Sequence, residues 1–208
     1  MNASTSFIFA VASLLLQGLF AEAQIIRWGS CESQNVTVMQ NFNTDPYLGR
    51  WYEQERYYAA AEAGLTCVTA EYSPHHDGGI NVNNTGVDSN GKASSVVGTG
   101  YAPDPSQPAK LMVKFPGAGP AGSLWIIDTD YTSYSVAYSC SNMAPFRLVN
   151  AWLLSRARDG FPHDAIEKVE KVLRERNIEK DPFEHVNQDG CTNGSNQQRP
   201  KIFLASAA

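Results

Sequence analysis

The chain has 208 residues and a formal net charge of −5 at pH 7, and 43% of its residues are hydrophobic. This mild acidic balance, without any cluster of Lys or Arg, argues against a nucleic-acid partner, because phosphate-binding proteins concentrate positive charge. The length fits a short leader followed by one all-β domain.

The first predicted element is an N-terminal leader. An apolar run over residues 7–16 is followed by Ala21-Glu22-Ala23, which has the A-x-A pattern of a cleavage site. The run is shorter than the roughly 20 apolar residues that span a bilayer. We therefore predict a cleaved signal peptide over residues 1–23, a secreted, extracellular protein and no stable membrane insertion.

Eight β-rich runs follow, separated by clusters of Gly, Pro, Asn and Asp. These clusters favour turns, because Gly and Asn accept positive φ and Pro fixes φ. Short strands at such close spacing are typical of an antiparallel sandwich or barrel, and closing eight strands into a barrel removes the exposed edges. The strands are predicted near residues 50–58, 67–73, 80–85, 94–101, 109–115, 123–129, 134–140 and 147–156.

Alternation along these runs predicts which side chains face the interior of the barrel, because neighbouring residues of a strand point to opposite faces. In each run the more apolar face is expected to point inward. At eight strands, a barrel interior is wide enough to hold side chains and one small ligand. The predicted inward-facing set includes Val68, Tyr72, Val113, Phe115, Tyr138 and Trp152.

One amphipathic helix is predicted after the last strand. Apolar residues at positions 165, 166, 169, 172 and 173 follow the spacing of one helix face. Pro162 suits the first turn of this helix and Asn177 its end. We expect its apolar stripe to dock on the outside of the barrel, which completes a domain over residues 24–191. The polar segment 192–208 is predicted to be a flexible tail.

The cysteines and sequons agree with secretion. An even number of cysteines in an oxidising compartment favours two disulfides, for which three pairings are possible, and the absence of C-x-x-C spacing argues against a zinc or redox site. Sequons mark candidate glycosylation sites. The cysteines are Cys31, Cys67, Cys140 and Cys191, and the sequons begin at Asn35, Asn83 and Asn193.

Three motifs at fixed places connect the chain with a known family. They are the strand start Gly49-Arg50-Trp51, the turn Thr129-Asp130-Tyr131 and, at the end of the last strand, Arg156. In this order they resemble the lipocalin family. The stretches NFNTDPYLGRWYEQERY, PAKLMVKF, DTDYTSYSVAYSC and AWLLSR are similar to its apolipoprotein D and Lazarillo branch.

The resemblance implies an all-β fold, an eight-stranded antiparallel up-and-down barrel with one C-terminal helix packed outside. It implies that Arg156 covers Trp51 at the barrel floor and that the disulfides are Cys31–Cys140 and Cys67–Cys191. The function implied is a secreted carrier that reversibly binds a fatty acid, sterol, retinoid or similar ligand, as a monomer or weak oligomer without a cofactor. The ligand-facing positions implied are Tyr72, Phe115, Leu124 and Trp152.

Two other functions fit the same family. Some lipocalins carry a pigment, a bilin or a carotenoid, and one branch isomerises prostaglandins with a free cysteine inside the barrel. We expect no catalysis, because all four cysteines are assigned to disulfides. We also expect no metal site at His75-His76-Asp77, because adjacent histidines in a hairpin point apart.

Three features near the first and fifth strands are less usual. Glu53 and Glu55 share the parity of Trp51, so both are expected to point inward, where they are hydrogen-bonded or line a wet channel rather than act as an acid–base pair. Gln54 stands where the branch usually has an aliphatic residue. The loop 116–122, PGAGPAG, lacks the bulky apolar residues of relatives, which argues against insertion into a membrane or lipoprotein.

Overall fold

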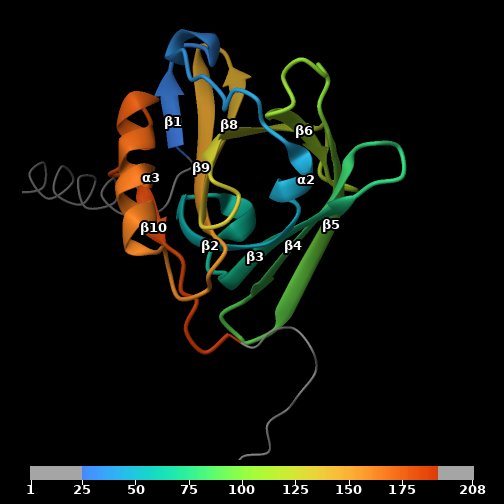
Figure 1. The fold of residues 1–208 in the computed structure, drawn as a ribbon, viewed down its shortest axis with the longest axis vertical. Coiled ribbons are helices and arrows are strands. Elements are labelled where there is room, and N and C mark those ends of the chain that lie inside the picture. The colour runs from blue at the N-terminus through green and yellow to red at the C-terminus, as the bar shows by residue number, and fades with distance from the viewer. Residues whose placement is uncertain (1–24, 192–208) are drawn as a thin grey trace, which may run out of the picture.

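The computed structural model describes residues 25–191. The predicted signal peptide, the tail and Asn193 lie outside the described residues. Ten strands form one antiparallel sheet in the order β1-β9-β8-β7-β6-β5-β4-β3-β2-β10, which closes into a barrel because β9 also pairs with β2 (Figure 1). The strands are β1 Ile25–Trp28, β2 Gly49–Tyr57, β3 Thr66–Pro74, β4 Ile80–Val87, β5 Ala93–Tyr101, β6 Lys110–Lys114, β7 Gly122–Thr129, β8 Tyr134–Met143, β9 Phe146–Ser155 and β10 Phe183–His185.

The barrel proper consists of β2 to β9, which match the eight predicted strands to within a few residues. Each of these strands pairs with the next one along the chain, so the predicted up-and-down barrel is confirmed. The short strands β1 and β10 were not predicted. They lengthen the sheet beside β9 and β2 and leave the closure between those two strands intact.

The helices are α2 (Thr44–Tyr47), α3 (His163–Glu175) and the short 3₁₀ turns η1 (Glu32–Gln34) and η2 (Ala60–Glu62). Helix α3 lies along the outside of the barrel, where Figure 1 shows it beside β1. Its buried face consists of Ala165, Val169, Val172 and Leu173, whereas Ile166 is exposed. Within residues 25–191, no helix has the length and apolar character needed to cross a membrane.

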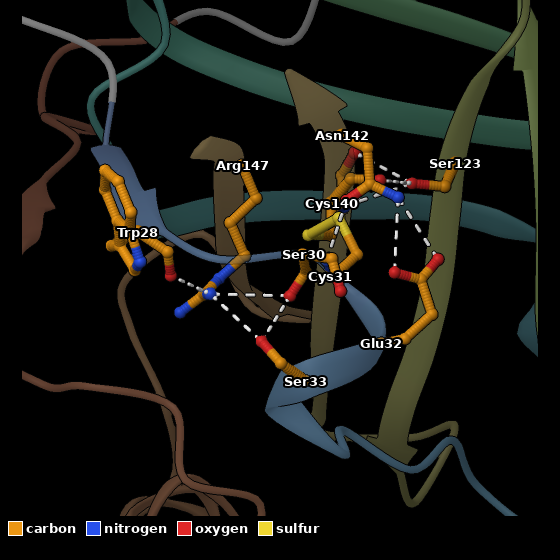
Figure 2. Close-up of a disulfide and its surroundings, with 10 residues drawn as sticks. Trp28, Ser30, Cys31, Glu32, Ser33, Ser123, Cys140, Asn142 and Arg147 are labelled. Carbon is orange, nitrogen blue, oxygen red and sulfur yellow. Dashed lines mark hydrogen bonds between the residues drawn. A yellow bond between two sulfur atoms is a disulfide. The ribbon is translucent and has the colours of Figure 1, made fainter. Parts of the chain in front are cut away.

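The two disulfides join Cys31 to Cys140 and Cys67 to Cys191, the pairing that the resemblance implied. The first fixes the segment before the barrel to β8, and Figure 2 shows how hydrogen bonds reinforce it. The Asn142 side chain accepts from the Cys31 backbone N–H at 2.7 Å and donates to Glu32. The buried Arg147 donates to the carbonyl oxygen of Trp28.

A β-bulge in β2 decides which side chains enter the barrel. Glu53 pairs with Leu154, but Glu55 pairs with Leu153, so Gln54 is the extra residue. Its side chain donates to the carbonyls of Ala157 and Arg158, at 3.1 and 3.3 Å. The bulge gives the unusual glutamine a structural role that an aliphatic side chain cannot fill.

The segment before Cys191 binds the backbone groups that the irregular parts of β2 and β3 leave outside the ladder. Val186 N–H donates to the Gln54 carbonyl at 2.8 Å. The Gln188 side chain donates to the carbonyls of Glu53 and Val68, both at 2.8 Å. The Cys67–Cys191 disulfide holds this segment in place, so the end of the domain supports the wall of the barrel from outside.

Candidate functional site

The base of the barrel is closed by Trp51, whose side chain is fully buried. The Arg156 guanidinium lies over the indole ring, with its carbon 3.7 Å from the ring centroid. Arg156 also donates to five backbone carbonyls at 2.8–3.1 Å, and the Trp51 indole N–H donates to the Tyr47 carbonyl at 2.9 Å. A stack of this kind contributes up to about 2 kcal/mol when it is desolvated.

The two other base motifs are arranged around this stack. Gly49 has a φ of 92°, a conformation that favours glycine, and a Cβ there would lie 3.5 Å from the Arg156 guanidinium. In the β7–β8 turn, the Asp130 carboxylate accepts from three backbone N–H groups. The Thr129 hydroxyl bonds within the same turn, and the Tyr131 carbonyl accepts from Arg156.

Above the base lies a cavity of about 440 Å³ inside the barrel. This volume falls within the range of roughly 300–1,000 Å³ that is usual for small-molecule sites. The cavity is bounded by the barrel wall and by two loops at the end opposite Trp51, which we call the mouth: the β2–β3 loop (58–65) and the β6–β7 loop (115–121). Its apolar lining includes Val68, Ala70, Tyr72, Val82, Val113, Phe115, Leu124, Ala137, Trp152 and Leu154.

Six of the seven predicted ligand-facing residues lie in this lining. Tyr138 does not, and the prediction that it points inward is wrong. In β8 the side chains that line the cavity are Ala137, Ser139 and Ser141, whereas Tyr138 belongs to the core cluster that includes Val169 and Leu173 of α3. Because α3 covers β8 from outside, both faces of this strand are buried, and its more apolar face lies under the helix.

A polar cluster extends along the cavity wall from Glu53, which pairs with Leu154, to Glu62 in the mouth loop. The Arg56 guanidinium donates to the Glu53 carboxylate at 2.8 Å and to the Glu62 carbonyl at 2.7 Å. The Glu62 carboxylate in turn accepts from the Trp152 indole N–H at 3.1 Å. Glu53 and Arg56 are only 4% and 6% exposed, so this ion pair is buried within the barrel.

The bulge at Gln54 produces this cluster and corrects a second prediction. After the bulge the parity of β2 reverses, so Arg56 pairs with the inward-facing Trp152. Glu55 pairs with Leu153, which belongs to the core beneath α3, and therefore points outward rather than inward. Burial, and secondarily the Glu62 charge, raise the pKa of Glu53 to about 8 despite its bond to Arg56.

The wall near the mouth also depends on a close approach between two strands. A Cβ at Gly98 would lie 2.5 Å from the Lys114 carbonyl and 2.6 Å from the Phe115 ring. Glycine at this position therefore lets the Phe115 ring approach β5 closely, where it lines the cavity. Alternation predicted the inward direction of Phe115 but gave no signal for this requirement at Gly98.

Sequence reasoning missed several polar residues in the lining, among them Asn84, Asn150 and Ser139. The signal was present, because Asn84 shares the parity of Val82, and Asn150 that of Trp152. Strand alternation was used to find apolar faces, so Asn84 and Asn150 on those faces were passed over, and Ser139 was placed outside together with the error at Tyr138. Their side chains give this cavity a mixed wall rather than a purely apolar one.

The remaining predicted positions lie on the surface. Asn35 is exposed and follows η1 in a left-handed conformation. The Asn83 side chain accepts from the Ser95 hydroxyl at 2.8 Å and is half-buried. His75 bonds to Asp77 at 2.6 Å in the β3–β4 hairpin, and the described part of the chain has no group of three potential metal ligands. Glycosylation at these sequons stays a prediction.

Comparison with known proteins identifies the family to which this chain belongs. The model of the lipocalin-like domain family matches residues 42–188. Apolipoprotein D of Macaca fascicularis is 35% identical over 179 residues, which cover 85% of this chain and 93% of that protein. The chain belongs to the lipocalin family. The Lazarillo protein of Schistocerca americana is 28% identical to this lipocalin, over 76% of the chain and 78% of that protein.

Solved structures agree with the fold of this lipocalin. Insecticyanin from the tobacco hornworm Manduca sexta superposes with a TM-score of 0.70 at 24% identity, covering 79% of this chain and 89% of that chain. Lobster apocrustacyanin A1 superposes with a TM-score of 0.66 at 23% identity, covering 78% and 91%. At these identities the likeness concerns the barrel and its helix.

Proposed function

We propose that this lipocalin is a secreted carrier that reversibly binds a small lipophilic molecule in its barrel cavity. The observation that carries the proposal is the cavity of about 440 Å³ above the Trp51 floor, lined by Tyr72, Phe115 and Trp152. Burial of a methylene contributes about 0.8 kcal/mol, and micromolar affinity needs about 8 kcal/mol net of the association cost. A sterol or a long hydrocarbon chain supplies enough apolar surface, whereas a small polar metabolite does not.

Secretion is supported by three independent features. The leader over residues 1–23 has a cleavage pattern. All four cysteines are in disulfides, which persist in oxidising compartments. The sequon at Asn35 is exposed. Its glycan is expected to appear as a mass difference that peptide N-glycosidase removes.

A carrier fits the cavity better than the isomerase alternative. That alternative requires a free cysteine in the barrel, and no cysteine of this chain is free. The pigment alternative uses the same cavity and predicts visible absorbance from the purified protein. Absorbance measured on protein from its natural source, together with mass spectrometry of the bound molecules, separates coloured from colourless ligands.

Ligand binding is tested by titrating the purified chain with a sterol, a retinoid and a long-chain alcohol while tryptophan fluorescence is recorded. Because Trp152 lines the cavity, we expect saturable quenching. Ala70→Phe fills the cavity and is expected to weaken binding at least about tenfold, a change of 1.4 kcal/mol. Ala93→Phe, at an exposed position of β5, is the control. Unsaturable signals with every ligand class contradict the proposal.

A further inference from the structure

The charged side chains that line the cavity are acidic. Among the described residues, the side chains that line the cavity include the carboxylates Glu53 and Glu62 but no Lys, Arg or His. The neighbouring cation, Arg56, is already bonded to Glu53 and to the Glu62 carbonyl. At neutral pH Glu53 holds a proton, because its pKa is raised to about 8, so Glu62 supplies the negative charge of the lining. A ligand acid that enters the cavity therefore meets a carboxylate and no lining cation that could neutralise it.

Two asparagines of the lining also have a side-chain oxygen without a hydrogen-bond partner. The Oδ1 atoms of Asn84 and Asn150 are buried and have no hydrogen-bond partner. They belong to β4 and β9, so one lies on each side of the barrel. The Trp152 N–H, a donor in the same wall, is occupied by Glu62. Buried acceptors without a donor are unfavourable by about 1–3 kcal/mol each, so a small side-chain movement that brings either oxygen to a guest hydroxyl stabilises the complex. The half-buried Glu62 carboxylate is the acceptor that faces the cavity directly, and it favours a guest that donates a hydrogen bond.

We propose that the ligand is an uncharged lipid with a hydroxyl group, and that the cavity discriminates against a carboxylate on the same hydrocarbon chain. The inference rests on the proposed carrier function and narrows its ligand class. A hydroxyl group donates as well as accepts. A carboxylate only accepts, and it has to lose its hydration beside Glu62 without gaining a counter-charge.

The arrangement of the wall gives the direction in which such a ligand lies. The deep part of the cavity, next to the Trp51 floor, is lined by Tyr72, Val82 and Leu154, which suit a hydrocarbon body, and by Glu53, the register partner of Leu154, which is neutral when it holds its proton. Asn150 and Glu62 lie toward the mouth, where Asn150 pairs with Ser139 across the strands. The hydroxyl group is placed at this end, within the polar part of the wall.

The test compares two ligands with one chain, oleyl alcohol and oleate, added below their aggregation limits to the delipidated full chain at neutral pH. Binding is followed by displacement of a fluorescent probe and by tryptophan quenching. We expect oleyl alcohol to bind at least about tenfold more tightly than oleate. Glu62→Gln keeps an acceptor for the Trp152 N–H but removes the charge. We expect oleate affinity to rise at least about tenfold in this variant, so that the preference for the alcohol shrinks.

Two further variants separate charge from hydrogen bonding. Glu55→Gln removes an outward-facing charge from the same strand as Glu53 and is expected to change neither affinity. Asn150→Leu removes an acceptor and is expected to lower alcohol affinity without improving that of oleate. Oleate binding as tightly as the alcohol overturns the inferred selectivity alone. Failure of both ligands, together with the sterol and retinoid, overturns the carrier function itself.

Discussion

The two ends of the barrel are built in opposite ways. At the base, one cation stacks on a buried indole and binds five backbone carbonyls, so Arg156 joins β9 to the chain before β2. At the mouth, the loop 116–121 is mostly exposed, and Gly117 and Gly119 have φ values of 77° and 84°. The base is closed by tight packing, whereas the mouth is bordered by an exposed loop, through which we propose that the ligand enters.

The same contrast holds for charge. The base neutralises Arg156 with carbonyl dipoles, and no carboxylate is among its hydrogen-bond partners there. The wall toward the mouth holds Arg56 with a carboxylate that burial drives toward its neutral form. Between about pH 6 and 8 the stability of the base is therefore expected to be insensitive to pH, because the pKa of its Asp130 carboxylate is lowered and that group stays ionised, whereas the stability of the wall around Glu53 depends on pH in this range.

The largest effect is expected from removal of the base clamp. Arg156→Ala leaves several carbonyls without a donor and exposes the Trp51 ring. We expect the free energy of unfolding to fall by at least about 3 kcal/mol, measured by chemical denaturation with the disulfides intact. The matched control is Arg50→Ala, which removes an exposed ion pair to Glu71 and is expected to change stability by less than about 1 kcal/mol. Equal losses in the two variants contradict the contrast between the ends.

The next effect comes from the mouth and depends on pH. Because the pKa of Glu53 is raised to about 8 in the folded chain and is ordinary in the unfolded chain, folding takes up a proton between these values. The contribution of Glu53 to the free energy of unfolding is therefore fully present below about pH 4.5, and it is lost as the pH rises through about 8. Between about pH 6 and 7.5 we expect a loss of about 2 kcal/mol, at 1.36 kcal/mol per unit.

Glu53→Gln is expected to remove this slope, because glutamine does not titrate. Denaturation curves collected at several pH values measure the difference between the variant and the parent chain. Glu55→Gln, which changes an outward-facing carboxyl group of the same strand, should keep the slope of the parent chain. If the Glu53→Gln variant retains the full slope, another group is responsible and the electrostatic account of the mouth is incorrect.

Most of the barrel was predictable from local chemistry. The turn clusters of Gly, Pro, Asn and Asp divided the chain into eight strands because such turns depend only on nearby residues. The base was predictable as well, since the resemblance placed Arg156 on Trp51. Alternation placed Tyr72, Phe115 and Trp152 toward the interior, because only one face of each of these strands is strongly apolar.

The errors have a common physical origin in tertiary context. Tyr138 points outward because α3 covers β8, and a strand with two buried faces gives no reliable alternation. Glu55 points outward because Gln54 adds one residue to β2, and a shift of one residue exchanges the two faces. The bulge forms where the distant residues Val186 and Gln188 bind the backbone, so no local pattern marks it.

A smaller effect is expected from the wall between the two ends. Gly98→Ala places a methyl group against the Lys114 carbonyl and the Phe115 ring, so Phe115 has to move. We expect a loss of about 1.5 kcal/mol and weaker binding of the lipophilic ligand, as measured by denaturation and by tryptophan quenching. Gly122→Ala is the control for the denaturation measurement alone, because a Cβ there meets nothing within 4 Å although the residue lines the cavity. If the Gly98→Ala variant has the stability of the parent chain, Phe115 and β6 move aside without cost, and this wall is no more rigid than the mouth.

The smallest effect on stability is expected at the tip of the mouth. Insertion of Gly-Ser between Ala118 and Gly119 lengthens an exposed loop, and loop entropy changes little with length, so the free energy of unfolding should fall by less than about 0.5 kcal/mol. The same insertion after Asp130 separates its carboxylate from the backbone N–H groups of the base turn, and it is expected to destabilise the chain far more. Denaturation of the two insertion variants therefore measures directly how unequally the barrel distributes its stability. A mouth insertion as damaging as the base insertion means that the loop is part of the packed structure rather than a free edge of the cavity.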